Sequence, residues 1–214
     1  AGMLREELVN ARQYLEKRDQ DNADQNLHYE AWRPVFEKKI PLKAHVHRVD
    51  DIFTAIRIAK EFDLNMTLDH CSEGHLIAEE ILESGFPAIV GPDLATRNKI
   101  EVQNAAFKTA GILARAGVTV SVTTDHPVSL IESLPLCVGL SVKHGLSMED
   151  GFRAMTINAA RICGVSDRIG SIEPGKDADI AVFDGNPMEV FTNTLMTIID
   201  GKIVYRREEA DQSL

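Results

Sequence analysis

Three segments of the chain place a histidine or an aspartate directly after a short run of apolar, strand-forming residues, with the sequences AHVH, DHC and TDHP. In a strand, residues two apart share a face, so His45 and His47 are expected on the same side. Neutral imidazoles and a carboxylate can hold a hydrolytic metal ion that keeps one position open for water. His45, His70 and Asp125 supply that combination from three different strand ends.

Other polar side chains near these strand ends have different expected roles. Lys43 lies two residues before His45, and we expect a solvent-facing or salt-bridged lysine rather than a carbamylated ligand that bridges two metals. His47, His75 and His126 are candidates for contact with a substrate, because each lies close in sequence to one of the proposed site residues.

The elements that must position these residues alternate between short apolar strands and segments with helical periodicity. Strands are predicted at residues 40–47, 65–69, 87–90 and 118–123. Helices are predicted at residues 51–62, 74–84, 99–116 and 148–163. Four strand-then-helix units in a row indicate a parallel β/α architecture, in which functional residues gather at the carboxyl ends of the strands.

The two ends of the chain have a different pattern. Residues 4–17 are predicted to form a helix and residues 19–26 a polar loop. Short strands are predicted at 180–183, 195–199 and 202–205, and the last two are joined by Asp200-Gly201, a strong hairpin signal. We therefore expect two domains, a β/α unit over residues 1–164 and a small antiparallel β unit over residues 165–214.

The composition excludes several classes of protein. The 214 residues are 44% hydrophobic and 26% charged, which is typical of a globular protein that is soluble in water. With 33 acidic and 23 basic residues, the formal net charge is −10, which argues against nucleic acid or an anionic membrane as a partner. No apolar stretch approaches the roughly 20 residues of a membrane span, and the first residues do not resemble a signal peptide, so we expect a cytoplasmic protein.

The three cysteines do not suggest a disulfide framework or a thiolate metal site. Cys71, Cys137 and Cys163 are widely spaced and form no CxxC motif. We expect them to be free, buried side chains that pack as small apolar groups.

The segments around the candidate residues resemble the amidohydrolase superfamily, and among its members the imidazolonepropionase-related enzymes in particular. The strings KAHVHRVDDI, TLDHCSEGH and GVTVSVTTDHP are similar to its fifth, sixth and eighth barrel strands. The string TINAARICGVSDRIGSIEPGKDADIAVFDGNP resembles its passage from the last barrel helix into a β-sandwich. The likeness covers residues 4–205.

The resemblance implies a (β/α)8 TIM barrel in which a divalent metal activates water to attack an amide or cyclic amide bond of a small molecule. Zinc is the expected metal, with iron, manganese or nickel as alternatives. His45, His70 and Asp125 would be ligands, Asp125 would also act as the general base, and His70 would either bind a metal or polarise the carbonyl group.

One feature of the family has no counterpart in this sequence. Members carry a His-x-His pair at the end of the first barrel strand, whereas the pair His45-Val46-His47 aligns with the fifth strand. We therefore expect the C-terminal half of a barrel plus part of the sandwich, with an incomplete metal site that is inactive alone. Such a chain would form homo-oligomers or associate with its missing N-terminal half. The alternatives are a non-catalytic half-barrel subunit and a deaminase of the same fold.

Overall fold

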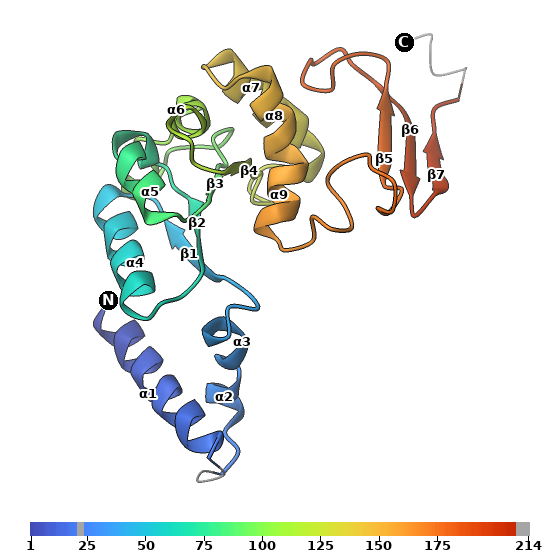
Figure 1. The fold of residues 1–214 in the computed structure, drawn as a ribbon. Helices are drawn as coiled ribbons and strands as arrows, with labels where there is room; N and C mark the ends of the chain where they lie inside the picture. Colours follow the sequence, from blue (N-terminus) through green and yellow to red (C-terminus); the bar gives the residue numbers. More distant parts are fainter. Residues whose placement is uncertain (21–23, 209–214) are drawn as a thin grey trace.

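The computed structural model describes residues 1–20 and 24–208, which contain two separate β-sheets (Figure 1). The first sheet is parallel, and its strands follow the order of the sequence: β1 (Leu42–Val46), β2 (Met66–His70), β3 (Ala88–Val90) and β4 (Val120–Val122). The second is antiparallel: β5 (Ile180–Phe183), β6 (Thr194–Ile199) and β7 (Lys202–Arg206). The predicted strands are all present, and the predicted parallel β/α architecture is confirmed.

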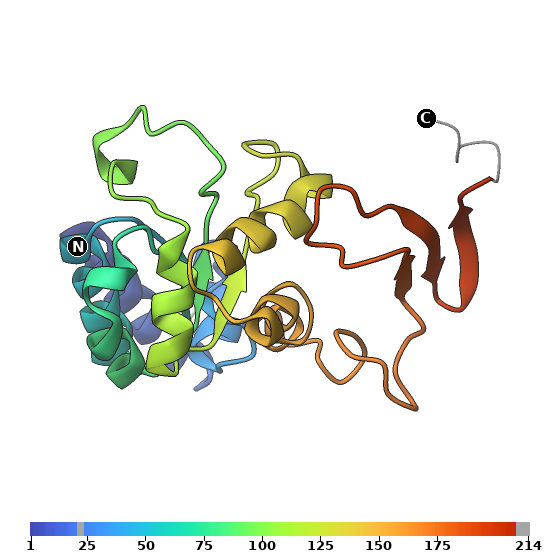
Figure 2. The same cartoon turned by 90° about the horizontal axis from the view of Figure 1, so that it is seen from above.

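Helices follow each parallel strand. They are α4 (Val49–Glu61), α5 (Ala78–Ser84), α6 (Lys108–Ala116), and then α7 (Leu134–Lys143), α8 (Met148–Met155) and α9 (Ile157–Ile162). Figures 1 and 2 place α4, α5 and α6 beside the parallel sheet and the antiparallel sheet apart from it, with α7, α8 and α9 between the two sheets. Four consecutive strand-and-helix units are consistent with part of a TIM barrel. In the described part of the chain, no helix is both long enough and apolar enough to cross a lipid bilayer.

The two faces of the parallel sheet differ in polarity near its first strand. Ile52 of α4, Leu68 of β2 and Leu113 of α6 are completely buried in the core between sheet and helices. Lys43 lies on the other face and is exposed, where its Nζ atom forms an ion pair with Asp69 Oδ2 at 3.1 Å. The expectation of a salt-bridged lysine agrees with this contact.

Three predicted helices are interrupted in the structure. In the segment 99–116, a short 3-10 turn, η2 (Ile100–Val102), is separated from α6 by residues that are not helical, and among them Asn104 donates a hydrogen bond to Glu73 Oε1 at 2.7 Å. In the segment 148–163, Thr156 has φ −130° and ψ −99° and separates α8 from α9. The predicted helix at 74–84 likewise begins as a 3-10 turn, η1 (Gly74–Leu76), before α5.

Two further features differ from the sequence-based expectation. Helix α7 was not predicted, because its sequence LPLCVGLSVK is apolar almost throughout and shows no helical alternation. Cys71 and Cys137 are buried as expected, and all three cysteines are free. Cys163, however, is exposed, so its predicted burial is wrong: it caps the C-terminus of α9, where the chain leaves the packed helices.

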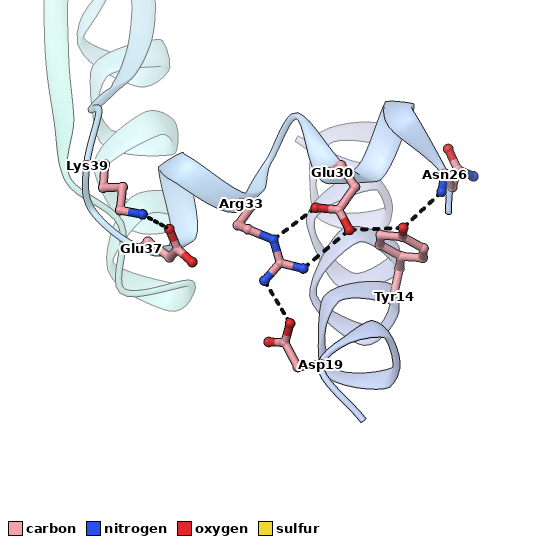
Figure 3. Close-up of polar contacts among 7 residues, drawn as sticks. All are labelled: Tyr14, Asp19, Asn26, Glu30, Arg33, Glu37 and Lys39. Carbon is pink, nitrogen blue, oxygen red and sulfur yellow. Dashed lines mark hydrogen bonds and ion pairs between the residues drawn. The ribbon is translucent and has the colours of Figure 1, made fainter. Parts of the chain in front are cut away.

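The N-terminal helices are α1 (Gly2–Arg18), α2 (Leu27–Glu30) and α3 (Arg33–Phe36), and a polar network joins them (Figure 3). The Arg33 guanidinium donates from Nε to Glu30 Oε2 at 2.9 Å and from Nη1 to Asp19 Oδ1 at 2.8 Å. The Tyr14 hydroxyl donates to Glu30 Oε1 and accepts from the Asn26 backbone. These bonds fix the short helices against α1. Residues 21–23 of the predicted polar loop lie outside the described residues.

The antiparallel sheet confirms the hairpin that the sequence predicts. Asp200 and Gly201 both adopt positive φ, 50° and 72°, between β6 and β7. A two-residue turn with two left-handed residues matches the twist of the flanking strands, which explains the preference for Asp-Gly at this point.

Candidate metal centre

Three imidazoles meet at the carboxyl ends of β1 and β2. His45 Nδ1 lies 3.1 Å from His70 Nε2, and His45 Nε2 lies 3.0 Å from His47 Nε2. One nitrogen from each ring lies within 4.8 Å of the others, close enough for the three histidines to hold one metal ion. The predicted site residues His45 and His70 are therefore brought together, and His47 joins them.

A left-handed turn at the end of β2 brings His70 into this cluster. The parallel register pairs His45 with Asp69 and Val46 with His70, so regular alternation would send the His70 side chain to the opposite face from His45. Instead, His70 and Cys71 have φ values of 71° and 49°, a region that residues other than glycine rarely occupy. The turn is held by a 2.8 Å hydrogen bond from the Cys71 backbone N–H to the Val46 carbonyl.

The ring nitrogens that face away from the cluster have oxygen partners. His70 Nδ1 lies 2.7 Å from the Gly91 carbonyl oxygen, and His47 Nδ1 lies 2.8 Å from the hydroxyl of the buried Ser72. A carbonyl only accepts, so Nδ1 of His70 carries the proton and its Nε2 lone pair faces the cluster. Metal-binding histidines have this arrangement, in which an oxygen partner fixes the tautomer and the orientation of the ring.

The pKa values of two of the rings are lowered, which keeps them in the uncharged form that a metal ion requires. His45 is exposed at the cavity, but partial desolvation of its ring lowers its pKa, and a nearby positive charge on His70 would lower it further. The same two causes lower the pKa of His47 to about 4. At neutral pH both rings are therefore uncharged and able to donate a lone pair to a metal ion.

A cavity of about 270 Å³ opens beside the histidine cluster. It is lined by the cluster together with Ser72 and Gly91, by the segment after β3, and by Asp125. The carboxyl ends of all four parallel strands therefore contribute to one pocket, as expected for a parallel β/α fold.

Asp125 faces this cavity from the segment after β4. Its backbone is left-handed, with φ 48°, and its backbone N–H donates to Thr123 Oγ1 at 3.0 Å. The side chain is exposed at the cavity wall and is not one of the three groups that lie within ligand distance of each other. The structure thus places Asp125 in the same pocket as the histidines, and its role as a ligand and base stays a prediction.

The other two histidines considered for substrate contact do not line the cavity. His75 Nδ1 lies 3.0 Å from Thr109 Oγ1, between η1 and α6, where the ring is half-buried. His126 is exposed beside Asp125.

Asp93 also lines the cavity, although the sequence pattern did not predict a role for it. Its carboxyl group is half-buried, and burial raises its pKa to about 6, while the charge of Arg97 opposes this shift. The signal was present in the sequence, because the residues GPD follow the third predicted strand at the same edge. That strand carries no histidine, so its sequence alone does not indicate that the residues after it belong to the site.

Known proteins resemble the chain over most of its length. The model of the Amidohydrolase family matches residues 21–204. An imidazolonepropionase of Fusobacterium nucleatum is 28% identical over 183 residues, which cover 79% of this chain and 42% of the relative. An amidohydrolase from Hapsidospora irregularis is 25% identical over 83% of this chain and 18% of its own length.

A solved amidohydrolase from Thermotoga maritima shares the fold closely. It superimposes with a TM-score of 0.92 at 37% sequence identity, over 96% of this chain and 55% of that protein. A Xaa-Pro dipeptidase with bound methionine has a TM-score of 0.63 at 21% identity, which is a likeness of fold. The chain thus spans about half the length of these relatives or less.

Proposed function

Because the chain belongs to the amidohydrolase family, we propose that it provides the histidine side of a metal-dependent site that hydrolyses a carbon–nitrogen bond in a small molecule. The observation that carries the proposal is the convergence of His45, His47 and His70 on a cavity that Asp125 also lines. The proposed bond is an amide or a cyclic amide, since named imidazolonepropionases are among the relatives.

The donor set fits a divalent metal ion. Three imidazole nitrogens within 4.8 Å of one another, two of them on rings oriented by an oxygen partner, are suitable for zinc, iron, manganese or nickel. In this proposal His47 contacts the ion rather than the substrate, and Asp125 is a candidate fourth ligand. A divalent ion bound here supplies Lewis-acid activation of a water molecule and of the scissile carbonyl group.

Asp125 has the chemistry required of the general base. An exposed carboxylate at the cavity wall can accept a proton from the attacking water and deliver it to the leaving nitrogen, so that it ends the cycle unprotonated. The Gly91 carbonyl keeps Nδ1 of His70 protonated and the ring fixed, so the opposite nitrogen faces the reaction site.

The division into domains is part of the same proposal. Residues 1–164 would supply one part of the catalytic barrel, and residues 165–214 strands of a smaller β domain. The parallel order β1-β2-β3-β4 and the separate antiparallel sheet support this division.

The test is an assay of the protein as its source produces it, with its metal content measured on the same sample. N-acyl amino acids, dipeptides and cyclic amides form the substrate panel. We expect turnover that is lost on chelation and restored by one of the four metals. Ammonia released from an amino-substituted ring would instead support the deaminase alternative. Bound metal without any turnover would favour the non-catalytic subunit.

A further inference from the structure

We infer that Glu73 is a positioning residue that holds the turn carrying His47 and the loop between β3 and α6 in fixed positions relative to each other. The inference rests on the proposed function, because it concerns how two walls of that site are kept together. Glu73 itself does not line the cavity, so it acts through residues that do.

The first contacts fix His47 at the end of β1. The backbone N–H of Glu73 donates to the His47 carbonyl at 2.8 Å. The preceding residue, Ser72, is buried, and its hydroxyl lies 2.8 Å from His47 Nδ1. One short turn after β2 therefore holds both the backbone and the ring of His47.

The side chain of Glu73 binds the same turn at a second point. Its Oε2 atom accepts the N–H of Val49, the first residue of α4, at 2.8 Å. Val49 follows His47 by two residues, so the chain is bonded to Glu73 at His47 and again directly after it. A carboxylate is a stronger acceptor than a neutral group, and a negative charge is favourable at the N-terminus of a helix.

The other carboxylate oxygen of Glu73 contacts the loop between β3 and α6. Its Oε1 atom accepts a hydrogen bond from the Asn104 side chain at 2.7 Å. Val102 and Ala105, which lie on either side of Asn104 in the chain, both line the cavity. Residues 94–100 of the loop are exposed, so little packing holds them in place. The bond to Glu73 thus fixes the end of the loop that leads into α6.

The segments that follow β1, β2 and β3 therefore meet at one side chain, which has one donor for each oxygen. A glutamine could keep both contacts, because its oxygen can accept from Val49 and its amide can donate to the side-chain oxygen of Asn104 once that amide is turned. An alanine could keep neither. This difference separates the hydrogen bonds of Glu73 from its charge.

Amide hydrogen exchange, followed by NMR in the full 214-residue chain, tests the inference without metal or substrate. Asn104→Ala removes the loop contact alone. The amides of Gln103 and Ala105, which donate within the loop, should then exchange roughly tenfold faster. Glu73→Ala should have the same effect and should also accelerate exchange of its own amide, which donates to His47, by a similar factor. Glu73→Gln should leave both segments as they are in the unsubstituted chain.

Glu83→Ala is the matched control, since Glu83 is an exposed glutamate on α5 outside the cavity. A general loss of stability would accelerate exchange throughout the parallel sheet, whereas the loss expected here is confined to two segments. The inference is wrong if Glu73→Ala leaves either segment unchanged, if the loss is uniform over the sheet, or if the glutamine variant behaves like the alanine variant.

Turnover of the protein as its source produces it gives a second, independent measurement. Asn104→Ala should raise KM roughly three- to tenfold with little change in kcat, because it moves a wall of the cavity and leaves the histidines in place. Glu73→Ala should also lower kcat roughly tenfold, since His47 loses its support. Equal changes of kcat in the two variants would contradict the link between Glu73 and His47. An unsubstituted protein without turnover would contradict the proposed function alone, and the exchange rates would still decide this inference.

Discussion

At the scale of single residues, two of the four proposed site residues (His45, His47, His70 and Asp125) have a backbone conformation that residues other than glycine rarely adopt. His70 and Asp125 are both left-handed, whereas His45 lies in a regular strand. A residue other than glycine in this region costs about 1 kcal/mol or more. Local hydrogen bonds help to offset that cost: His70 bonds to the Gly91 carbonyl through its ring, and the Asp125 backbone N–H donates to Thr123 Oγ1.

Replacing Asp125 with asparagine tests its proposed role as the base. Asparagine tolerates left-handed backbone and keeps an oxygen atom at the same place, but it cannot accept the proton from water. We expect kcat to fall by about 100- to 10,000-fold in the protein as its source produces it, while the fold and most of the metal are retained. A variant with near-normal kcat would show that another group removes the proton. Asp167→Asn, at an exposed site outside the cavity, is the control.

Asp93 gives a prediction for the pH dependence of stability. Its pKa is raised from 3.8 to about 6 in the folded protein, so the folded state holds this proton more tightly than the unfolded state. The stabilisation is complete below pH 3.8 and is lost as the pH rises through about 6. Asp93→Asn should therefore raise the free energy of unfolding at pH 7 by about 1–3 kcal/mol.

Urea denaturation of this variant and the unsubstituted chain across the acidic range is the measurement. The difference in free energy of unfolding should shrink toward zero near the lower of the two pKa values. If Asp93→Asn raised the free energy of unfolding equally in acid and at neutral pH, the asparagine would stabilise the protein by packing or hydrogen bonding instead. Asp167→Asn again serves as the matched substitution at an exposed carboxylate.

At the scale of elements, the sequence predicts the features that depend on local backbone preferences. It does not predict those that depend on contacts between distant segments. The Asp200-Gly201 hairpin and the shared face of His45 and His47 depend on backbone periodicity, so the sequence alone predicts them. The left-handed turn at His70 could not be predicted, because a β pattern gives no sign of a reversal in φ at its last residue. Nor does the sequence mark the break at Thr156, on either side of which α8 and α9 both contact β4.

The start of α4 is another case in which a distant residue decides the outcome. Asp50 and Asp51 are of a type that often caps helices, but the helix begins earlier, at Val49, and both lie within its first turn. The carboxylate of Glu73, 24 residues away in the chain, accepts the Val49 N–H. Such a cap is visible only when the fold has brought the two segments together.

The end of β3 offers a test of how one element supports the site. Gly91 has φ 115°, and a Cβ atom there would overlap the Thr123 carbonyl oxygen. Gly91→Ala should lower the free energy of unfolding by clearly more than the roughly 1–2 kcal/mol of left-handed strain, and should weaken metal binding because the Gly91 carbonyl orients His70.

The control is Gly175→Ala, where φ is 92° and no atom lies within 4 Å of an added Cβ. This variant has the left-handed strain without the overlap. It should therefore lower the free energy of unfolding by only the roughly 1–2 kcal/mol of that strain and leave the metal affinity unchanged. Equal losses of stability in the two variants, measured by urea denaturation, would contradict the role of close packing at Gly91.

At the scale of the whole molecule, the parallel sheet has two open edges. The order β1-β2-β3-β4 leaves β1 and β4 with one neighbour each. In the antiparallel sheet, the strand β7 is exposed along its length, including Ile203 and Val204. Open backbone groups and exposed apolar side chains are features that proteins in solution normally cover by pairing or packing.

We therefore expect the 214-residue chain to associate in solution. Sedimentation velocity over a range of protein concentrations should show species larger than 23.7 kDa, either copies of the chain or a complex with a separate complementary partner. The net charge of −10 limits nonspecific aggregation, so discrete species are expected. A monomer at every concentration with cooperative unfolding would contradict this.

The three clustered imidazoles are also near one another along the chain. Only 25 positions separate His45 from His70, and one strand–helix–strand unit contains the whole cluster. Closing so short a stretch costs little conformational entropy. A ribosome releases these residues well before Asp125, which β4 must bring into place. In the proposed function, metal binding and completion of the hydrolytic pocket are therefore separate events during biosynthesis, because the three imidazoles emerge before the proposed base.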